Sequence, residues 1–243
     1  SYLQKGGHVV VHTEAVALQH DHNGVHGLKL RQTLPNGEVV ERTVHVRGGV
    51  VLATGGFNRH AQRRAQMLPG AQEAWCPAGP GHTGTAQELA VQAGARMGSG
   101  GLSHAFWAPV SIRQRADGST AAFPHFVMDR GKPGMLTVDQ SGKRYLNESS
   151  SYHVFGMRMQ EHHAITPSVP SWLICDAAAL KRYGIGMVRP GGKGLAPYLA
   201  DGYLKCGATL VELAHQLQIP ADALKSTVER FNHFADTGVD QDF

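Results

Sequence analysis

Cysteine is scarce in this sequence. Its three residues, Cys76, Cys175 and Cys206, lie far apart, and no Cys-x-x-Cys pair occurs. This scarcity argues against a disulfide framework and against a zinc site built on thiolates. Because few and unpaired cysteines fit a reducing environment, the sequence favours a cytoplasmic location.

Long hydrophobic runs and blocks of like charge are also missing. No segment approaches the roughly 18 apolar residues that cross a bilayer, and the N-terminus shows no basic-then-apolar signal pattern. The formal net charge of +4 is spread out, and no run of Lys or Arg is longer than the pair Arg63-Arg64. The sequence therefore predicts no membrane span and no nucleic-acid partner.

Metal sites and serine hydrolase motifs find little support. The sequence contains 15 histidines, but the pairs His20/His22 and His162/His163 lack Asp, Glu or Cys at ligand spacings. No Gly-x-Ser-x-Gly elbow occurs. Surface or core positions explain these histidines better than a metal site does.

The N-terminal quarter of the chain predicts strands. Segments 15–18, 25–34 and 39–46 are separated by turn sequences at 21–24 and 35–37, which predicts a small antiparallel meander. The continuous apolar run 50–53 then predicts a strand buried on both faces in a parallel sheet. A strand that closes an ordinary sheet would have the same pattern.

Two glycine-rich loops follow the meander. The first, Ala-Thr-Gly-Gly at 53–56, has small residues where a packed core would use larger ones, and such a turn lets the backbone approach a ligand. The second, at 79–84, opens a helix predicted from Thr85 onward, so its N–H groups can meet a phosphate. Alone it is either an anion site or a plain helix start, but the two loops together indicate a nucleotide cofactor.

The composition changes beyond residue 101, where aromatic residues, histidine and proline become frequent. A hairpin is expected over 135–146 and a buried strand over 171–175. Thr209 and Glu212 have the spacing of a capping box before one amphipathic helix, and Pro220 opens a second one. We therefore expect a domain boundary near residue 100 and a mixed second part that ends in helices.

The order of motifs along the chain is more specific than any single motif. The motifs are Gly-Gly-Val-Val-Leu-Ala-Thr-Gly-Gly-Phe at 48–57, His-Thr-Gly-Thr-Ala at 82–86, Phe-Trp-Ala-Pro at 106–109, Gly-Met-Leu-Thr-Val-Asp at 134–139 and Gly-Lys-Arg-Tyr-Leu-Asn-Glu-Ser-Ser-Ser-Tyr at 142–152. In this order they resemble the FAD-dependent fumarate reductase and 3-ketosteroid dehydrogenase flavoprotein family. The resemblance continues through 208–214 to 238–243, so it covers essentially the whole chain.

The resemblance implies an α+β fold in two parts. Residues 1–100 would form part of an FAD-binding, Rossmann-like domain with the small antiparallel meander, and residues 101–243 an α+β cap domain that closes over the flavin ring. The family's N-terminal Gly-x-Gly-x-x-Gly unit and its final FAD-contacting segment are absent from the sequence. We therefore expect a fragment of a longer protein that alone is inactive and binds FAD weakly or not at all.

The resemblance also implies which residues contact the cofactor. Those that would line FAD are Ala53, Thr54, Gly55, Gly56, Thr83 and Gly84. The sequence departs from the family pattern at Thr85 and Ala86, where Asp and Gly are usual. The departure puts the second contact, at Thr83 and Gly84, in doubt.

On the substrate side, the resemblance implies that Tyr152 is catalytic, because fumarate reductases have a proton-donating Arg at this place and ketosteroid dehydrogenases a Tyr. A phenol is a poor base near neutral pH, so Tyr152 would need help from other groups. Phe106 and Trp107 would form an apolar wall for the substrate or else pack in the core. Arg130 and Arg144 either orient the hairpin or take part in a proton path, and for Arg144 the structural role is favoured.

The sequence thus predicts an FAD-dependent oxidoreductase that dehydrogenates or reduces a carbon–carbon bond next to a ketone. The expected partner is a small apolar ketone, with homo-oligomers through exposed surfaces of the truncated domain left open. One alternative keeps the family but takes an unsaturated carboxylate, as fumarate and urocanate reductases do. Another is a non-catalytic module that retains the cap fold.

Overall fold

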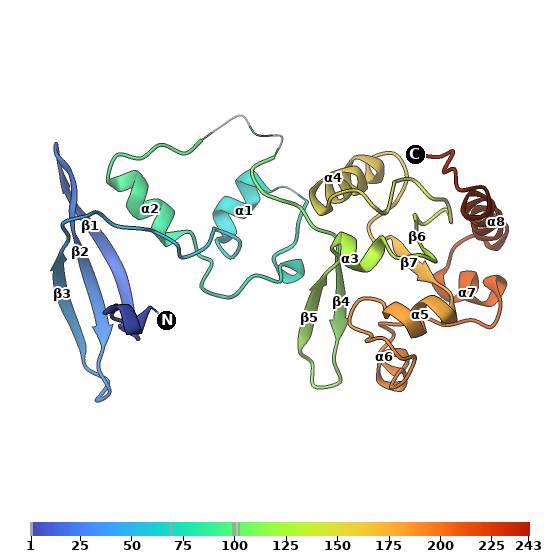
Figure 1. Ribbon diagram of the computed structural model, residues 1–243, viewed down its shortest axis with the longest axis horizontal. Coiled ribbons are helices and arrows are strands. Elements are labelled where there is room, and N and C mark those ends of the chain that lie inside the picture. Colours follow the sequence, from blue (N-terminus) through green and yellow to red (C-terminus); the bar gives the residue numbers. More distant parts are fainter. Residues whose placement is uncertain (1, 69, 99–100, 102) are drawn as a thin grey trace. The chain divides into compact units, whose positions relative to one another are not determined.

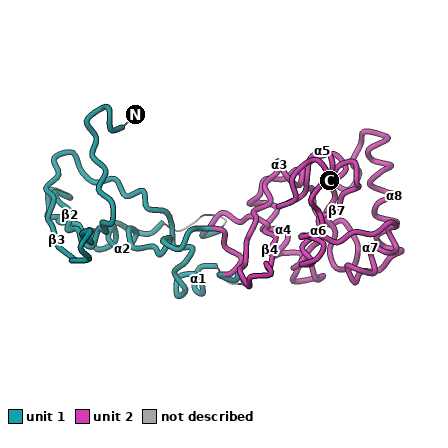
Figure 2. Tube along the Cα trace, turned by 90° about the horizontal axis from the view of Figure 1, so that it is seen from below, with its two compact units in different colours: residues 1–73, 78–104 teal, residues 74–77, 105–243 magenta. Residues whose placement is uncertain are grey.

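The computed structural model describes residues 2–68, 70–98, 101 and 103–243. It is a mixture of helices and small antiparallel sheets (Figure 1). The chain forms two compact units, Ser1–Glu73 with Ala78–His104 and Ala74–Pro77 with Ala105–Phe243 (Figure 2). We call them unit 1 and unit 2, in the order given.

Unit 1 begins with the meander that the sequence predicts. The elements in order are η1 (Leu3–Lys5), β1 (Thr13–Asp21), β2 (Gly24–Thr33), β3 (Val39–His45), α1 (Ala61–Met67), the start of η2 (Glu73–Trp75) and α2 (Thr85–Gln92). Both strand pairs are antiparallel, in the order β1-β2-β3. The turn between β1 and β2 is closed by the Asn23 N–H, which donates to the Asp21 carboxylate at 2.7 Å. The prediction of a meander is confirmed.

The predicted buried strand at 50–53 is wrong. Residues 50–53 form no strand, and the Val51 side chain is 91% exposed. A buried parallel strand needs partners on both edges, and among the described residues no strand pairs with this segment. The segment is apolar, but its burial as a strand would depend on partner strands that pair with it.

The second glycine loop does open a helix. Gly84 precedes α2 with φ at +79°, and the helix is followed by Gly94 at +94°, whose N–H donates to the Val91 carbonyl at 3.0 Å. Left-handed backbone at these two positions is easy for glycine alone, so the sequence sets both ends of α2. The helix predicted from Thr85 is confirmed.

Unit 2 combines two two-stranded antiparallel sheets with six helices among its described residues. The elements in order are β4 (Val110–Gln114), β5 (Thr120–Pro124), α3 (Val127–Arg130), β6 (Met135–Val138), α4 (Tyr152–His163), β7 (Trp172–Cys175), α5 (Ala177–Tyr183), α6 (Ala196–Ala200), α7 (Leu210–Leu217) and α8 (Ala221–Thr237). The strand expected at 171–175 is present as β7, and it pairs with β6 along its whole length. The hairpin expected over 135–146 is reduced to one bridge, between Val138 and Arg144.

The main core of unit 2 lies where α7 and α8 pack against the β6–β7 sheet. Its buried members are Leu136, Val138, Ile174, Ala214, Leu217, Ile219 and Leu224. The predicted capping box holds the start of α7: the Glu212 N–H donates to Thr209 Oγ1 at 3.1 Å, and the Glu212 carboxylate accepts the Ala208 N–H at 2.8 Å. The amphipathic pattern and the cap together place both C-terminal helices as predicted.

Within the described part of the chain, no helix is long and apolar enough to cross a membrane. Nor does that part hold three or more His, Cys, Asp or Glu side chains grouped so that they could bind a metal ion.

Candidate functional site

The two glycine loops of unit 1 are bound to each other. The Gly84 N–H donates to the Gly56 carbonyl at 3.1 Å, and the Arg59 N–H donates to the His82 carbonyl at 2.8 Å. The loops are separated in sequence by α1, yet these two bonds hold them side by side. Four of the six predicted cofactor residues, Gly55, Gly56, Thr83 and Gly84, are therefore brought together.

Glycine is needed in these loops because the loops approach each other closely. A Cβ atom on Gly84 would lie 2.9 Å from Arg63 Nη1 and 3.0 Å from Phe57 Cβ. A Cβ atom on Gly55, where φ is +86°, would lie 2.9 Å from the His82 ring. The sequence pattern suggests that glycine is needed here so that the backbone can approach a ligand. In the structure, the atoms that exclude a side chain belong to the protein itself.

Gly84→Ala is expected to destabilise the full-length protein by about 1–3 kcal/mol and to weaken its flavin binding, because the new methyl group meets Arg63 and Phe57 in a strained backbone position. Urea unfolding and a flavin titration measure the two effects. Gly118→Ala is the matched control, since Gly118 has the same φ of +79° with nothing within 4 Å. Equal losses in the two variants would contradict the role given to loop contact.

In unit 2, Tyr152 is the first residue of α4. The helix is capped by Ser151, whose Oγ accepts the Val154 N–H at 3.3 Å. Tyr152 is 38% exposed, and its ring lies edge-on to the Phe126 ring, with the centroids 5.3 Å apart. Tyr152 thus stands at a fixed helix start, with an aromatic neighbour on one side.

Phe106 and Trp107 lie against the same end of α4. The Trp107 N–H donates to His153 Nδ1 at 3.1 Å, and the Phe106 ring lies 5.3 Å from the His153 ring. A Cβ atom on Gly156 would come within 2.7 Å of Trp107 Cβ, so this glycine lets Trp107 pack on the helix. Trp107 is half-buried and Phe106 is 81% exposed, which leaves Phe106 free to contact a ligand.

A buried ion-pair network holds the segment before Tyr152. Arg144 donates to both carboxylate oxygens of Glu148 and pairs with Asp240 at 2.8 Å. Glu148 also accepts the Thr137 N–H at 2.8 Å. Burial alone would lower the pKa of Arg144, but its hydrogen bonds to Glu148 and Asp240 raise it above the usual value. Sequence reasoning favoured a structural role for Arg144 but found neither partner.

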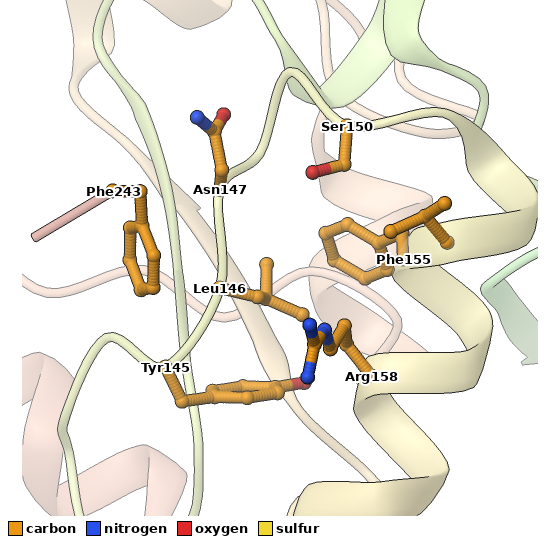
Figure 3. A pocket seen from close by; sticks show the side chains of 8 residues that line it. Tyr145, Leu146, Asn147, Ser150, Phe155, Arg158 and Phe243 are labelled. Atoms are coloured by element: carbon orange, nitrogen blue, oxygen red, sulfur yellow. The ribbon is translucent and has the colours of Figure 1, made fainter.

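A pocket of about 420 Å³ lies beside this segment (Figure 3). Its lining residues are Tyr145, Leu146, Asn147, Ser150, Val154, Phe155, Arg158 and Phe243. The Tyr145 hydroxyl is 2.7 Å from Ser171 Oγ, and burial raises the pKa of this phenol to about 12. Tyr152 does not line the pocket, so the pocket and the predicted catalytic side chain are separate features of unit 2.

Comparison with known proteins identifies the family. Residues 1–243 match the family model described as FAD binding domain. The chain belongs to this family. The sequence resemblance to FAD-dependent flavoproteins is therefore confirmed, and the cofactor is FAD.

Two relatives of this FAD binding domain chain are named as dehydrogenases. It is 36% identical to 4-oxocyclohex-2-ene-1-carboxylate 5-dehydrogenase of Sinomonas cyclohexanicum over 82% of its own length and 34% of that protein. It is 32% identical to 3-oxosteroid 1-dehydrogenase of Mycolicibacterium smegmatis over 99% of its own length and 42% of that protein. The chain thus spans about two fifths or less of these relatives.

A solved structure agrees with these relatives. The 3-ketosteroid Δ1-dehydrogenase from Sterolibacterium denitrificans, determined in complex with 1,4-androstadiene-3,17-dione, matches with a TM-score of 0.74 and 29% identity. The match covers all of the FAD binding domain chain and 42% of the other.

The loops of unit 1 fit a ligand with many acceptor atoms, as FAD is. Ala53, Thr54 and Gly55 are exposed, and their backbone N–H groups donate to no protein acceptor within the described residues. Thr83 Oγ1 lies 3.0 Å from Thr85 Oγ1, so the threonine that replaces the usual Asp bonds locally at the start of α2. These free donors beside a helix N-terminus suit the phosphate and carbonyl oxygens of a dinucleotide.

Proposed function

We propose that the whole protein dehydrogenates a carbon–carbon bond next to the ketone of a cyclic substrate, with FAD as its cofactor. The observation that carries the proposal is the tyrosine at position 152, held at the start of α4 beside Phe126, with Phe106 and Trp107 on the same helix end. A phenol among aromatic rings suits a neutral ketone. A small dianion would instead favour a fixed guanidinium at this place.

The residues of the two units take different parts in this reaction. We propose that unit 1 supplies part of the FAD domain, where the residues that hold FAD are Ala53, Thr54, Gly55, Gly56, Thr83 and Gly84, and that unit 2 is the cap. When bound, FAD would accept a hydride from the substrate carbon. The boundary between the two domains is proposed near residue 100.

Tyr152 would take the proton from the carbon next to the ketone. That carbon is acidified by the adjacent carbonyl. Tyr152 would act as a phenolate, its own hydroxyl proton having passed to solvent, and its phenolate oxygen would receive the carbon's proton as the neighbouring carbon loses its hydride. Phe106 would form an apolar wall that orients the ring of the substrate and excludes water, with Trp107 fixing it against α4. Positioning of this kind raises the rate of the chemical step, because the reacting groups have already lost their translational and rotational entropy on binding.

Turnover assays on the full-length protein test the proposal. The panel contains a 3-ketosteroid, a 4-oxocyclohexanecarboxylate and fumarate, with an artificial electron acceptor. We expect turnover of at least one cyclic ketone and none of fumarate. Turnover of fumarate alone would support the unsaturated-carboxylate alternative, and a protein with neither bound flavin nor turnover would support a non-catalytic module.

A further inference from the structure

Arg130 is the most deeply buried cation of unit 2 among the described residues. Its side chain ends α3 and is 1% exposed. The guanidinium donates to the carbonyls of His125 at 3.0 Å and Ser150 at 2.7 Å, and also to the carbonyl of Glu148. It lies over the Phe155 ring, 4.2 Å from the centroid. All of its named acceptors are backbone oxygens.

Burying the Arg130 guanidinium in this way costs folding free energy. We therefore infer that the charge has a role beyond filling space. Within the described residues, no carboxylate lies at ion-pair distance from Arg130. A buried charge without an ion pair loses its hydration and recovers only hydrogen bonds. Burial accordingly lowers the pKa of Arg130 to about 10, although Glu148 and Asp129 oppose the effect from farther away. An apolar side chain of similar size would fill the space without this cost.

The acceptors of Arg130 lie directly before Tyr152. The carbonyls of Glu148 and Ser150 belong to the short segment that leads into Ser151, the cap of α4. Arg130 therefore fixes the backbone from which the Tyr152 side chain leaves. On its other side, the same segment is held by Arg144 through the Glu148 side chain.

The same short helix also contacts the Tyr152 ring. Phe126 is the residue that caps α3, and its ring lies edge-on to Tyr152 at 5.3 Å. The Arg130 N–H donates to the Phe126 carbonyl at 3.2 Å, so the guanidinium and the ring belong to one turn of helix. Tyr152 is thus held from α3 in two ways, through its preceding backbone and through its ring.

We propose that Arg130 is a positioning residue for Tyr152, and that it acts by fixing the backbone of residues 148–150. The proposal rests on the proposed function, in which Tyr152 carries the proton. Lysine cannot replace Arg130 in this role. A guanidinium presents N–H groups in a rigid planar fork that reaches three carbonyls at once, whereas an ammonium is a single flexible point.

The kinetic test uses the full-length protein with FAD bound. We expect Arg130→Lys to lower kcat about 100-fold on the ketone substrate with KM and bound flavin nearly unchanged, because a small misplacement of a catalytic group has that cost. Arg113→Lys is the control. Arg113 is a half-buried arginine of the same unit that pairs with Asp201 at 2.6 Å and lies over the Tyr198 ring of α6. This variant should stay within about 2-fold of wild type.

The coupling to Tyr152 is measured in a double mutant. If Arg130 acts through Tyr152, adding Arg130→Lys to Tyr152→Phe should lower kcat by less than about 3-fold more. A further loss as large as in the single variant would show that Arg130 acts independently of Tyr152, and would overturn the proposal.

A second readout does not depend on activity. The protein is labelled with 3-fluorotyrosine, and the fluorine NMR resonance of Tyr152 is assigned by its absence in Tyr152→Phe. We expect Arg130→Lys to shift or broaden this resonance, and Arg113→Lys to leave it in place. If wild type turned over no ketone, the proposed function would fail while this measurement still tested the position of Tyr152.

Arg130→Gln guards against a variant that fails to fold. Glutamine removes the buried charge and keeps two N–H donors. An unmoved Tyr152 resonance in either folded variant overturns the proposal. So does failure of both variants to fold, since Arg130 would then be needed for the fold as a whole and not for Tyr152 in particular.

Discussion

Replacing Tyr152 by phenylalanine in the full-length protein is expected to lower turnover of the ketone substrate by about 100- to 10,000-fold, the usual contribution of a positioned acid or base. The change removes one hydroxyl and leaves the aromatic ring, which still packs against Phe126. Bound flavin should therefore be retained. Steady-state kinetics and the flavin absorbance of the purified variant measure both.

Tyr198→Phe is the control for this prediction. Tyr198 lies in α6 of the same unit, and its hydroxyl donates one hydrogen bond to the Met187 carbonyl at 3.1 Å. Loss of that bond should cost about 1 kcal/mol of stability and change turnover less than about 2-fold. Unchanged turnover in Tyr152→Phe would remove Tyr152 from the reaction.

Replacing Arg144 by methionine is expected to lower the free energy of unfolding of unit 2 by about 3–5 kcal/mol, since it leaves the Glu148 carboxylate buried without its cation. The two side chains are only 5% and 6% exposed. The variant also frees Asp240, whose pKa is held low by its hydrogen bond to Arg144. Urea unfolding followed by circular dichroism measures the loss.

Two further variants test whether the loss of stability comes from the buried, unpaired charge of Glu148. Arg158→Met breaks the exposed pair of Arg158 with Glu161 and should cost less than about 1 kcal/mol. Adding Glu148→Leu to Arg144→Met removes the unpaired carboxylate and should restore much of the stability. A double variant as unstable as Arg144→Met alone would show that packing around Arg144, and not the stranded charge, sets the cost.

Local patterns in the sequence predicted the fold wherever the deciding contacts are local. The meander, the start of α2 at Gly84 and the capping box at Thr209 depend on residues a few positions apart. The segment 50–53 shows the opposite case, because its apolar pattern is local but its burial requires partner strands. Local sequence patterns thus predict helices and strands, whereas contacts between residues far apart in the sequence determine which segments are buried.

The candidate site was predictable residue by residue but not as an arrangement. Motif order pointed to both glycine loops and to Tyr152, whereas the bond between Gly84 and Gly56 joins two loops across α1. Arg144 bonds to Asp240, 96 positions away, and Arg130 reaches Ser150, 20 positions away. No pattern of spacing in a single sequence carries such pairings, because they depend on how the elements pack.

The hydrogen bonds between the two glycine loops bear on how the cofactor is taken up. Because Gly84 and Arg59 donate across the loops, contacts within the protein itself fix the shape of this surface and preorganise it. A ligand that meets a preorganised surface loses less conformational entropy than one that must order a flexible loop. The rate of FAD binding at these loops should therefore be limited by the diffusional encounter of FAD with the protein, with no slow folding step of the loops themselves.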